Sequence, residues 1–171
     1  EIDYIICGEG EIAFKEWLDE LKSPCPDFVK VRGLVFRDGE RTVRTVARPD
    51  IEDLSVLPFP YPEDLTPFRQ KLVYYETTRG CPFQCQYCLS ANEKGVRYFP
   101  MERVKEELLR FIRAGIRQVK LVDRSFNCNL KWAKEIWRFL IAHPGETNLH
   151  FEVVGDLLDE EAFEILKEAP A

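Results

Sequence analysis

Apolar and polar residues change their spacing along the chain, and the last hundred residues show the clearest pattern. From Leu72 onward, short apolar runs of strand length alternate with stretches in which apolar residues recur every three or four positions. Predicted strands lie at about residues 72–77, 118–123 and 149–154. Predicted helices lie near residues 101–114 and 130–142, and a third starts at Asp159, a favoured N-cap residue. This alternation predicts an α/β fold with parallel strands joined by right-handed helical crossovers.

The first part of the chain follows a different order. A β-branched run over residues 3–7 ends at Gly8-Glu9-Gly10-Glu11, and a helix with one apolar face follows. The apolar positions of this helix are Phe14, Trp17, Leu18 and Leu21. Two carboxylates at its N-terminus would repel a phosphate, so we interpret the glycine turn as a capped turn and not as a nucleotide loop. Asp38-Gly39, between two β-prone runs, predicts a hairpin.

Residues 47–71 contain five prolines and little periodicity, which is typical of an extended linker. The linker also has apolar members, which predict that it is docked on the next domain and not free. They are Leu54, Leu57, Phe59 and Tyr61. We therefore predict three parts: residues 1–46, the linker 47–71, and the α/β region 72–171.

Composition limits the classes of protein to which the chain can belong. The 171 residues are 45% apolar and carry a formal net charge of −6, with an isoelectric point of about 5.1. An acidic chain of this kind gives no clear signal for nucleic-acid binding. No apolar run approaches the ~20 residues that cross a bilayer, and the start lacks the features of a signal peptide, so we expect a cytoplasmic protein without membrane association. The first residue is Glu1 and not Met, which predicts a fragment of a longer protein.

The densest group of metal-binding residues is Cys81, Cys85 and Cys88, with the spacing C-x3-C-x2-C. They follow the first predicted parallel strand, and ligand sites in such sheets lie at the carboxyl ends of the strands. Three thiolates can hold three irons of a [4Fe–4S] cluster and leave the fourth iron open for a substrate or cofactor. Zinc is an alternative, but structural zinc sites usually have four ligands, and the fourth would have to be the distant Cys128. Unligated thiols are a third interpretation, whereas three cysteines within eight residues cannot form a disulfide framework.

Residues 77–88, Thr-Thr-Arg-Gly-Cys-Pro-Phe-Gln-Cys-Gln-Tyr-Cys, resemble the cluster loop of the radical S-adenosylmethionine (SAM) enzymes, whose pattern is C-x3-C-x-aromatic-C. Tyr87 occupies the aromatic position. Two other stretches, residues 3–11 and 53–60, are similar to radical SAM enzymes that carry a cobalamin-binding domain ahead of the barrel. The resemblance implies that residues 72–171 form a partial (βα) radical SAM barrel, which is a partial TIM barrel. It also implies that residues 1–46 hold the tail of a Rossmann-like cobalamin-binding domain and a β-hairpin.

The same resemblance implies a chemistry. Cys81, Cys85 and Cys88 would bind the [4Fe–4S] cluster, and Tyr87 would lie against the adenine of SAM. The cluster, reduced by an external one-electron donor, would cleave SAM to methionine and a 5′-deoxyadenosyl radical for C–H modification or methyl transfer. Three of the six strand–helix units of such a barrel are visible, so we expect the fragment alone to be inactive.

Cobalamin is implied only for the full-length protein. The Asp-x-His-x-x-Gly stretch that often supplies the cobalt ligand does not occur in this sequence, so we expect no cobalamin on the fragment. The sequence leaves the substrate open, and its acidic charge favours a small molecule or a protein over RNA. The alternative function belongs to a different class. It is a non-catalytic structural module in which zinc or an iron–sulfur cluster stabilises the fold.

Two acidic residues at predicted strand ends complete the candidate site. Asp123 closes the second predicted strand and could receive the ammonium of SAM or part of the substrate, or it could cap the following turn. Glu152, on the third predicted strand, could reach into the barrel at the same level, or it could face solvent or form a salt bridge. The predicted cofactor-binding residues are therefore Tyr87, Asp123 and Glu152.

Overall fold

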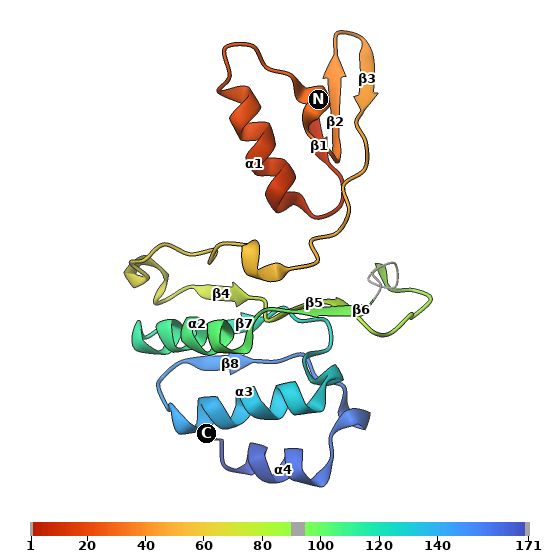
Figure 1. Cartoon of the computed structure of the whole chain (residues 1–171). Helices are drawn as coiled ribbons and strands as arrows, with labels where there is room; N and C mark the ends of the chain where they lie inside the picture. The colour runs from red at the N-terminus through yellow and green to blue at the C-terminus, as the bar shows by residue number, and fades with distance from the viewer. Residues whose placement is uncertain (1, 90–94, 170–171) are drawn as a thin grey trace. The chain divides into compact units, whose positions relative to one another are not determined.

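The computed structural model describes residues 2–89 and 95–169. The chain divides into two compact units, Glu1–Glu52 and Asp53–Ala171 (Figure 1). This division falls inside the segment that the sequence predicts as a linker. Among the described residues, none of the helices has the length and apolar character needed to cross a membrane.

The first unit is a three-stranded antiparallel sheet with one helix packed on it (Figure 1). In chain order its elements are β1 (Tyr4–Ile6), α1 (Gly10–Leu21), β2 (Leu34–Asp38) and β3 (Arg41–Arg44). The buried core residues are Ala13, Val31, Leu34 and Phe36. The predicted strand, helix and hairpin are confirmed. The hairpin turn is Gly39-Glu40, one residue later than Asp38-Gly39, because Asp38 still pairs with Arg41 in the ladder.

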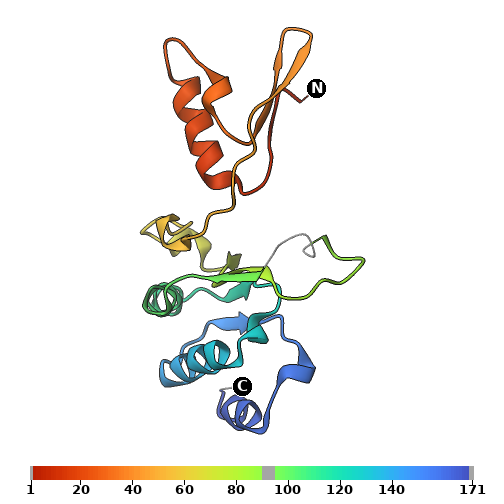
Figure 2. The ribbon, with the colours of Figure 1, turned by 45° about the vertical axis from the view of Figure 1, so that its right-hand side comes forward.

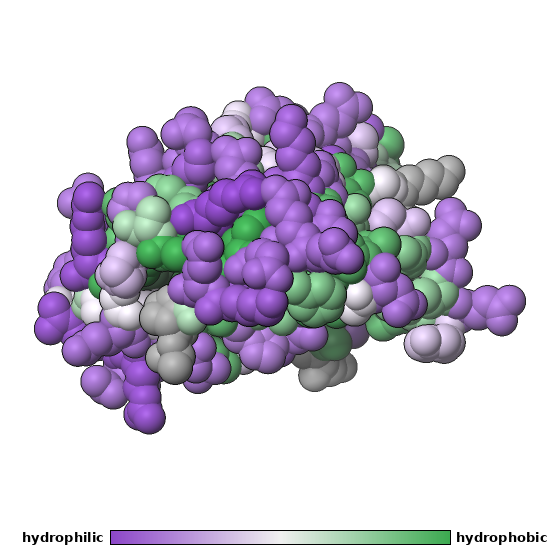
Figure 3. Space-filling model, turned by 90° about the horizontal axis from the view of Figure 1, so that it is seen from below, coloured by the Kyte–Doolittle hydropathy of each residue, from purple (hydrophilic) through white to green (hydrophobic). Residues whose placement is uncertain are grey.

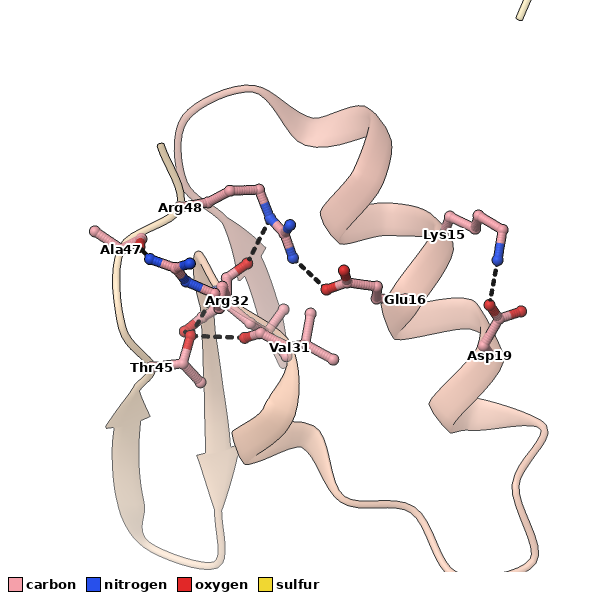
Figure 4. Close-up of polar contacts among 9 residues, drawn as sticks. Lys15, Glu16, Asp19, Val31, Arg32, Thr45, Ala47 and Arg48 are labelled. Atoms are coloured by element: carbon pink, nitrogen blue, oxygen red, sulfur yellow. Dashed lines mark hydrogen bonds and ion pairs between the residues drawn. The ribbon is translucent and has the colours of Figure 1, made fainter. Parts of the chain in front are cut away.

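Side-chain bonds hold the segment after β3 against the rest of the first unit (Figure 4). Arg48 forms an ion pair with Glu16 of α1, and its Nε donates to the carbonyl oxygen of Arg32 at 3.2 Å. Arg32 in turn donates to the carbonyl oxygen of Ala47 at 3.0 Å. Residues 47–48 are therefore part of the first unit in the structure.

The second unit contains a three-stranded parallel sheet, as the alternation of strands and helices predicts (Figures 1 and 2). The strands, in sheet order, are β4 (Leu72–Tyr75), β7 (Gln118–Leu121) and β8 (Asn148–His150). The helices are α2 (Met101–Arg113), α3 (Leu130–Ala142) and α4 (Glu160–Lys167). Asp159 is the N-cap of α4 as predicted, because its carboxylate accepts a hydrogen bond from the amide of Ala162 at 2.8 Å.

Short 3₁₀ turns occur in both units. They lie at Phe28–Lys30, Leu54–Val56, Thr66–Phe68, Phe126–Cys128 and Gly155–Leu157.

Each parallel strand ends earlier than predicted, and the reason is clearest at β8. Beyond β8 the backbone bonds to the loop that follows β7. The amide of Phe126 donates to the carbonyl oxygen of Glu152 at 2.9 Å. The Asn127 side chain exchanges two hydrogen bonds with the backbone of Val154, at 2.9 and 2.8 Å. These bonds replace the ladder and bring two loops together at the carboxyl end of the sheet.

The Pro-rich segment is docked, as predicted. Leu54 is buried, and the rings of Phe59 and Tyr61 lie 5.4 and 5.5 Å from the ring of Phe111 in α2. The Tyr61 hydroxyl donates to the carbonyl oxygen of Tyr74 at 2.7 Å and accepts from the Tyr74 amide at 3.0 Å. Tyr61 thereby occupies backbone groups on the outer edge of β4 that could otherwise pair with another strand.

Helix α4 packs on α3 through a small apolar contact and flanking ion pairs. Ala162 and Ile165 of α4 are buried, and Lys134 of α3 lies 2.6 Å from the Asp159 carboxylate. Viewed from below, the surface is mostly hydrophilic, with apolar side chains between the charged ones (Figure 3). Phe163 is half-exposed on α4. Scattered apolar side chains of this kind are normal on a protein surface.

A separate two-stranded sheet does not follow from the periodicity. β5 (Thr78–Cys81) pairs antiparallel with β6 (Gly95–Tyr98) (Figure 1). The prediction that the cysteine loop directly follows the first parallel strand needs correction, because β5 intervenes and Cys81 is its last residue. The two segments escape prediction because each is four residues long, contains a glycine and lacks strict alternation of apolar and polar residues.

Candidate metal centre

Cys81, the first cysteine of the motif, lies in the two-stranded β5–β6 ribbon. Cys81 pairs with Gly95 in the ladder, and the amide of Phe99 donates to the carbonyl oxygen of Thr77 at 3.1 Å, just before β5. Gly80 has φ +101°, and a Cβ at this position would lie 2.3 Å from the carbonyl oxygen of Gly95. The two backbones can approach this closely only because Gly80 has no side chain.

Gly80→Ala is therefore expected to loosen the ribbon that carries Cys81. A left-handed backbone costs a residue with a Cβ about 1–2 kcal/mol, and relief of the contact with Gly95 adds to that cost. Faster amide hydrogen exchange in residues 78–81 would measure the effect. The matched control is Gly95→Ala, because Gly95 has φ +75° but a Cβ there would meet nothing within 4 Å. Equal effects of the two substitutions would contradict the role of the close approach.

The three cysteines differ in exposure. Cys81 is buried, whereas Cys85 and Cys88 are exposed, and all three are free thiols. The amide of Cys88 donates to the carbonyl oxygen of Cys85 at 3.0 Å, so a turn brings these two positions close along the backbone. Within the described residues, no group of three or more His, Cys, Asp or Glu side chains is gathered closely enough to hold a metal ion. The ligand set Cys81, Cys85 and Cys88 thus stays a prediction.

The chemistry of this donor set nevertheless fits an iron–sulfur cluster. Three thiols that form no disulfide lie within eight residues, and two of them are open to solvent. Thiolates are the usual protein ligands of iron–sulfur clusters. The remaining candidate for a fourth ligand, Cys128, is partly buried, and its sulfur lies 4.0 Å from the hydroxyl oxygen of Tyr98.

Tyr87 lies on the exposed part of the cysteine loop. Its exposed fraction is 94%, so its ring is open to solvent in the structure. Phe83 on the same loop is 38% exposed. The predicted contact of Tyr87 with an adenine stays a prediction.

Asp123 is buried behind the cysteine-bearing strand. Its Oδ1 accepts hydrogen bonds from the hydroxyls of Thr77 and Thr78, both at 2.6 Å, and its Oδ2 accepts from the Thr77 amide at 3.3 Å. Thr77 immediately precedes β5 and Thr78 is its first residue, so the Asp123 carboxylate bonds to the start of β5. Burial raises the pKa of Asp123 above its ordinary value, while the hydrogen bonds from Thr77 and Thr78 act in the opposite direction.

Glu152 lies two residues beyond β8 and is half-exposed. Its carboxylate is 3.0 Å from Lys120 Nζ and 3.3 Å from His150 Nε2. The hydrogen bond from Lys120 holds the pKa of Glu152 below its ordinary value. This is the salt-bridged arrangement that the sequence left open, and the exposed carboxylate can still contact a ligand.

Four residues near the cysteine loop are not evident from the sequence. Ser125 Oγ lies 3.9 Å from the sulfur of Cys81, and Thr77, Thr78 and Gly80 hold or permit the position of β5. For Thr77, Thr78 and Gly80 the only sequence signal was their place next to the cysteine motif, and Ser125, 44 positions from Cys81, had no such signal. A cavity of about 430 Å³ lies elsewhere, at the amino end of β8, and is lined by residues that include Trp137, His143 and Thr147. It contains none of the candidate site residues.

Comparisons with known proteins match the region of the chain that contains the three cysteines. The family model described as the radical SAM superfamily matches residues 75–171, more than half of the chain. An uncharacterized methyltransferase of Pyrococcus horikoshii is 33% identical over 147 residues, which cover 79% of this chain and 31% of that protein. The cobalamin-dependent radical SAM methyltransferase TokK of Streptomyces tokunonensis is 32% identical, over 73% of this chain and 20% of that protein.

A solved structure is similar in fold. It is the radical SAM methyltransferase TsrM of Kitasatospora setae with cobalamin and a [4Fe–4S] cluster bound. The TM-score is 0.72 at 22% sequence identity, and the match covers 98% of this chain and 36% of that one. The chain thus spans about a third or less of the length of each of these proteins.

Proposed function

The chain belongs to the radical SAM superfamily, and from this premise we propose that it forms the cluster-binding part of an enzyme that cleaves SAM for methyl transfer or other C–H modification. One observation carries the proposal. Three cysteines that form no disulfide lie within eight residues, inside the region that matches the family. The first of them, Cys81, lies 3.9 Å from Ser125 in the loop at the carboxyl end of β7, a strand of the parallel sheet. That end of a parallel sheet is where α/β proteins bind ligands.

In this proposal each candidate residue has a definite task. Cys81, Cys85 and Cys88 bind the [4Fe–4S] cluster, which supplies the electron that cleaves SAM. Tyr87 lies against the adenine. Asp123 offers its carboxylate to the ammonium of SAM or to part of the substrate, and Glu152 contacts the cofactor from the same level of the barrel. The remaining chain orients the cofactor and excludes water.

A partial (βα) barrel is the proposed fold of residues 72–171. Its support is the parallel order β4-β7-β8, in which each strand is followed by a helix. We propose that β1 and the turn into α1 are the tail of a Rossmann-like cobalamin-binding domain and that β2 and β3 are the hairpin after it. Residues 47–71 would connect the two parts.

Methyl transfer with cobalamin is proposed for the whole protein, because two of the similar proteins are described as cobalamin-dependent or cobalamin-bound methyltransferases. The partners that we propose are an external one-electron donor and a substrate that is a small molecule or a protein. The acidic net charge of −6 favours these over a nucleic acid. We also propose a cytoplasmic location, and its support is the six cysteines, all of which are free thiols.

Anaerobic reconstitution of the full chain with iron and sulfide tests the proposal. The reduced protein is expected to give a [4Fe–4S] EPR signal that changes when SAM is added, because the fourth iron has no protein ligand. A signal that SAM leaves unchanged would support cluster binding alone and not SAM binding by this chain. Stoichiometric zinc binding without cluster formation would favour a structural metal module instead.

A further inference from the structure

A buried carboxylate connects two segments that lie far apart in the sequence. Asp123, at 1% exposure, follows β7, and its Oδ1 accepts from the hydroxyls of Thr77 and Thr78. Both threonines are themselves buried, at 0% and 3% exposure. The hydroxyl-to-carboxylate distances of 2.6 Å are those of strong, charge-assisted hydrogen bonds.

The threonines carry this connection to the cysteine loop. Thr78 begins β5, and Cys81 ends it three residues later. The Thr77 carbonyl oxygen also accepts from the amide of Phe99, which follows β6, so residues from two other segments bond to the start of β5. The segment of Asp123 makes a second contact with the same strand, since Ser125 Oγ lies 3.9 Å from the Cys81 sulfur.

We propose that Asp123 is a positioning residue for Cys81 and acts through the hydroxyls of Thr77 and Thr78. This inference rests on the proposed function, in which Cys81 is a cluster ligand, and assigns Asp123 a task besides cofactor contact. Buried hydroxyls that lose their acceptor are costly to keep buried. Without the carboxylate, the base of β5 therefore opens more often and Cys81 loses its shielded position.

Alkylation of the metal-free full chain tests the proposal without any cofactor. Each cysteine is labelled with iodoacetamide over time and quantified by mass spectrometry. In the wild type, buried Cys81 is expected to react more slowly than exposed Cys85 and Cys88. Asp123→Ala is expected to raise the Cys81 rate, relative to that of Cys85, by about tenfold, the size expected for the loss of buried hydrogen bonds.

A matched pair of substitutions keeps the test valid if Asp123→Ala does not fold. Thr78→Val removes the hydroxyl at nearly constant volume and is expected to expose Cys81. Thr78→Ser retains the hydroxyl and is expected to leave the ratio of rates unchanged. A purely structural role would lower thermal stability without this selective change and without rescue by serine, and that result would overturn the proposal.

Reconstitution with iron and sulfide shows whether a failed experiment contradicts the positioning role of Asp123 or the proposed function of the whole site. Asp123→Ala is expected to bind less cluster iron per chain than the wild type. If the variant keeps the wild-type alkylation ratio and iron content and loses only its response to SAM, Asp123 is a cofactor ligand and the positioning role is wrong. If the wild type itself takes up no cluster, the proposed function fails, while the alkylation ratios still decide whether Asp123 positions Cys81.

Discussion

Cys85→Ala is expected to abolish the [4Fe–4S] cluster and, with it, the EPR response to SAM. Three thiolates are the smallest set that holds three irons and leaves one open, so the loss of one ligand leaves two irons without protein ligands. Because Cys85 is exposed on a loop, the substitution should leave the rest of the fold unchanged. Iron and sulfide analysis after anaerobic reconstitution, together with EPR of the reduced protein, measures the effect.

Two other cysteines serve as controls for Cys85. Cys25→Ala removes an exposed free thiol in the first unit and should leave cluster content at the wild-type value. Cys128→Ala distinguishes the metals, because only a four-cysteine zinc site would require this residue. A Cys85→Ala chain that retains the full cluster, or a Cys128→Ala chain that loses all bound metal, would argue against the three-cysteine assignment.

Phe111→Ala is expected to destabilise the second unit by about 3–5 kcal/mol, the usual cost of removing a buried aromatic ring. Phe111 is fully buried in α2, and its ring lies 5.4–5.5 Å from the rings of Phe59, Tyr61 and Tyr75. The substitution leaves a cavity where α2, the Pro-rich segment and β4 meet. Native-state hydrogen exchange, followed separately in peptides from each unit, measures the change.

The comparison variant is Phe163→Ala. Phe163 is 52% exposed on α4, so its loss should change stability by less than about 0.5 kcal/mol. Peptides from α1 provide an internal reference, since the Phe111 contacts all lie in the second unit. Comparable destabilisation by both substitutions would show that Phe111 is not the centre of this core.

The local pattern of residue types was sufficient to predict most of the helices and strands. Apolar spacing together with the stop signal after Ala142 placed α3 at its observed bounds, and the capping preference of aspartate identified Asp159 as the N-cap of α4. These features depend on residues within about four positions of one another, which is the range of helical periodicity and capping. The parallel pairing of β4 and β7 followed from the alternation of elements, although the strand ends did not.

The chemistry of the cysteine motif was likewise present in the sequence, since the spacing of Cys81, Cys85 and Cys88 is a linear property. The contacts of the two acidic residues could not be predicted from the sequence. Asp123 bonds to threonines 45 and 46 positions away, and the ion pair between Glu152 and Lys120 depends on how β8 aligns with β7. Such contacts arise only when strands adopt a particular register, which no local period specifies.

The sequence by itself thus determined the α/β class, the helices and the spacing of the three thiols, because each is encoded by neighbouring residues. Tertiary structure decided that Cys81 ends a β-ribbon and is buried while Cys85 and Cys88 are exposed. It also decided that Asp123 faces the base of that ribbon. The physical reason is that burial and hydrogen bonding depend on which distant segments pack together, and four-residue strands with glycines carry too little pattern to reveal their partners.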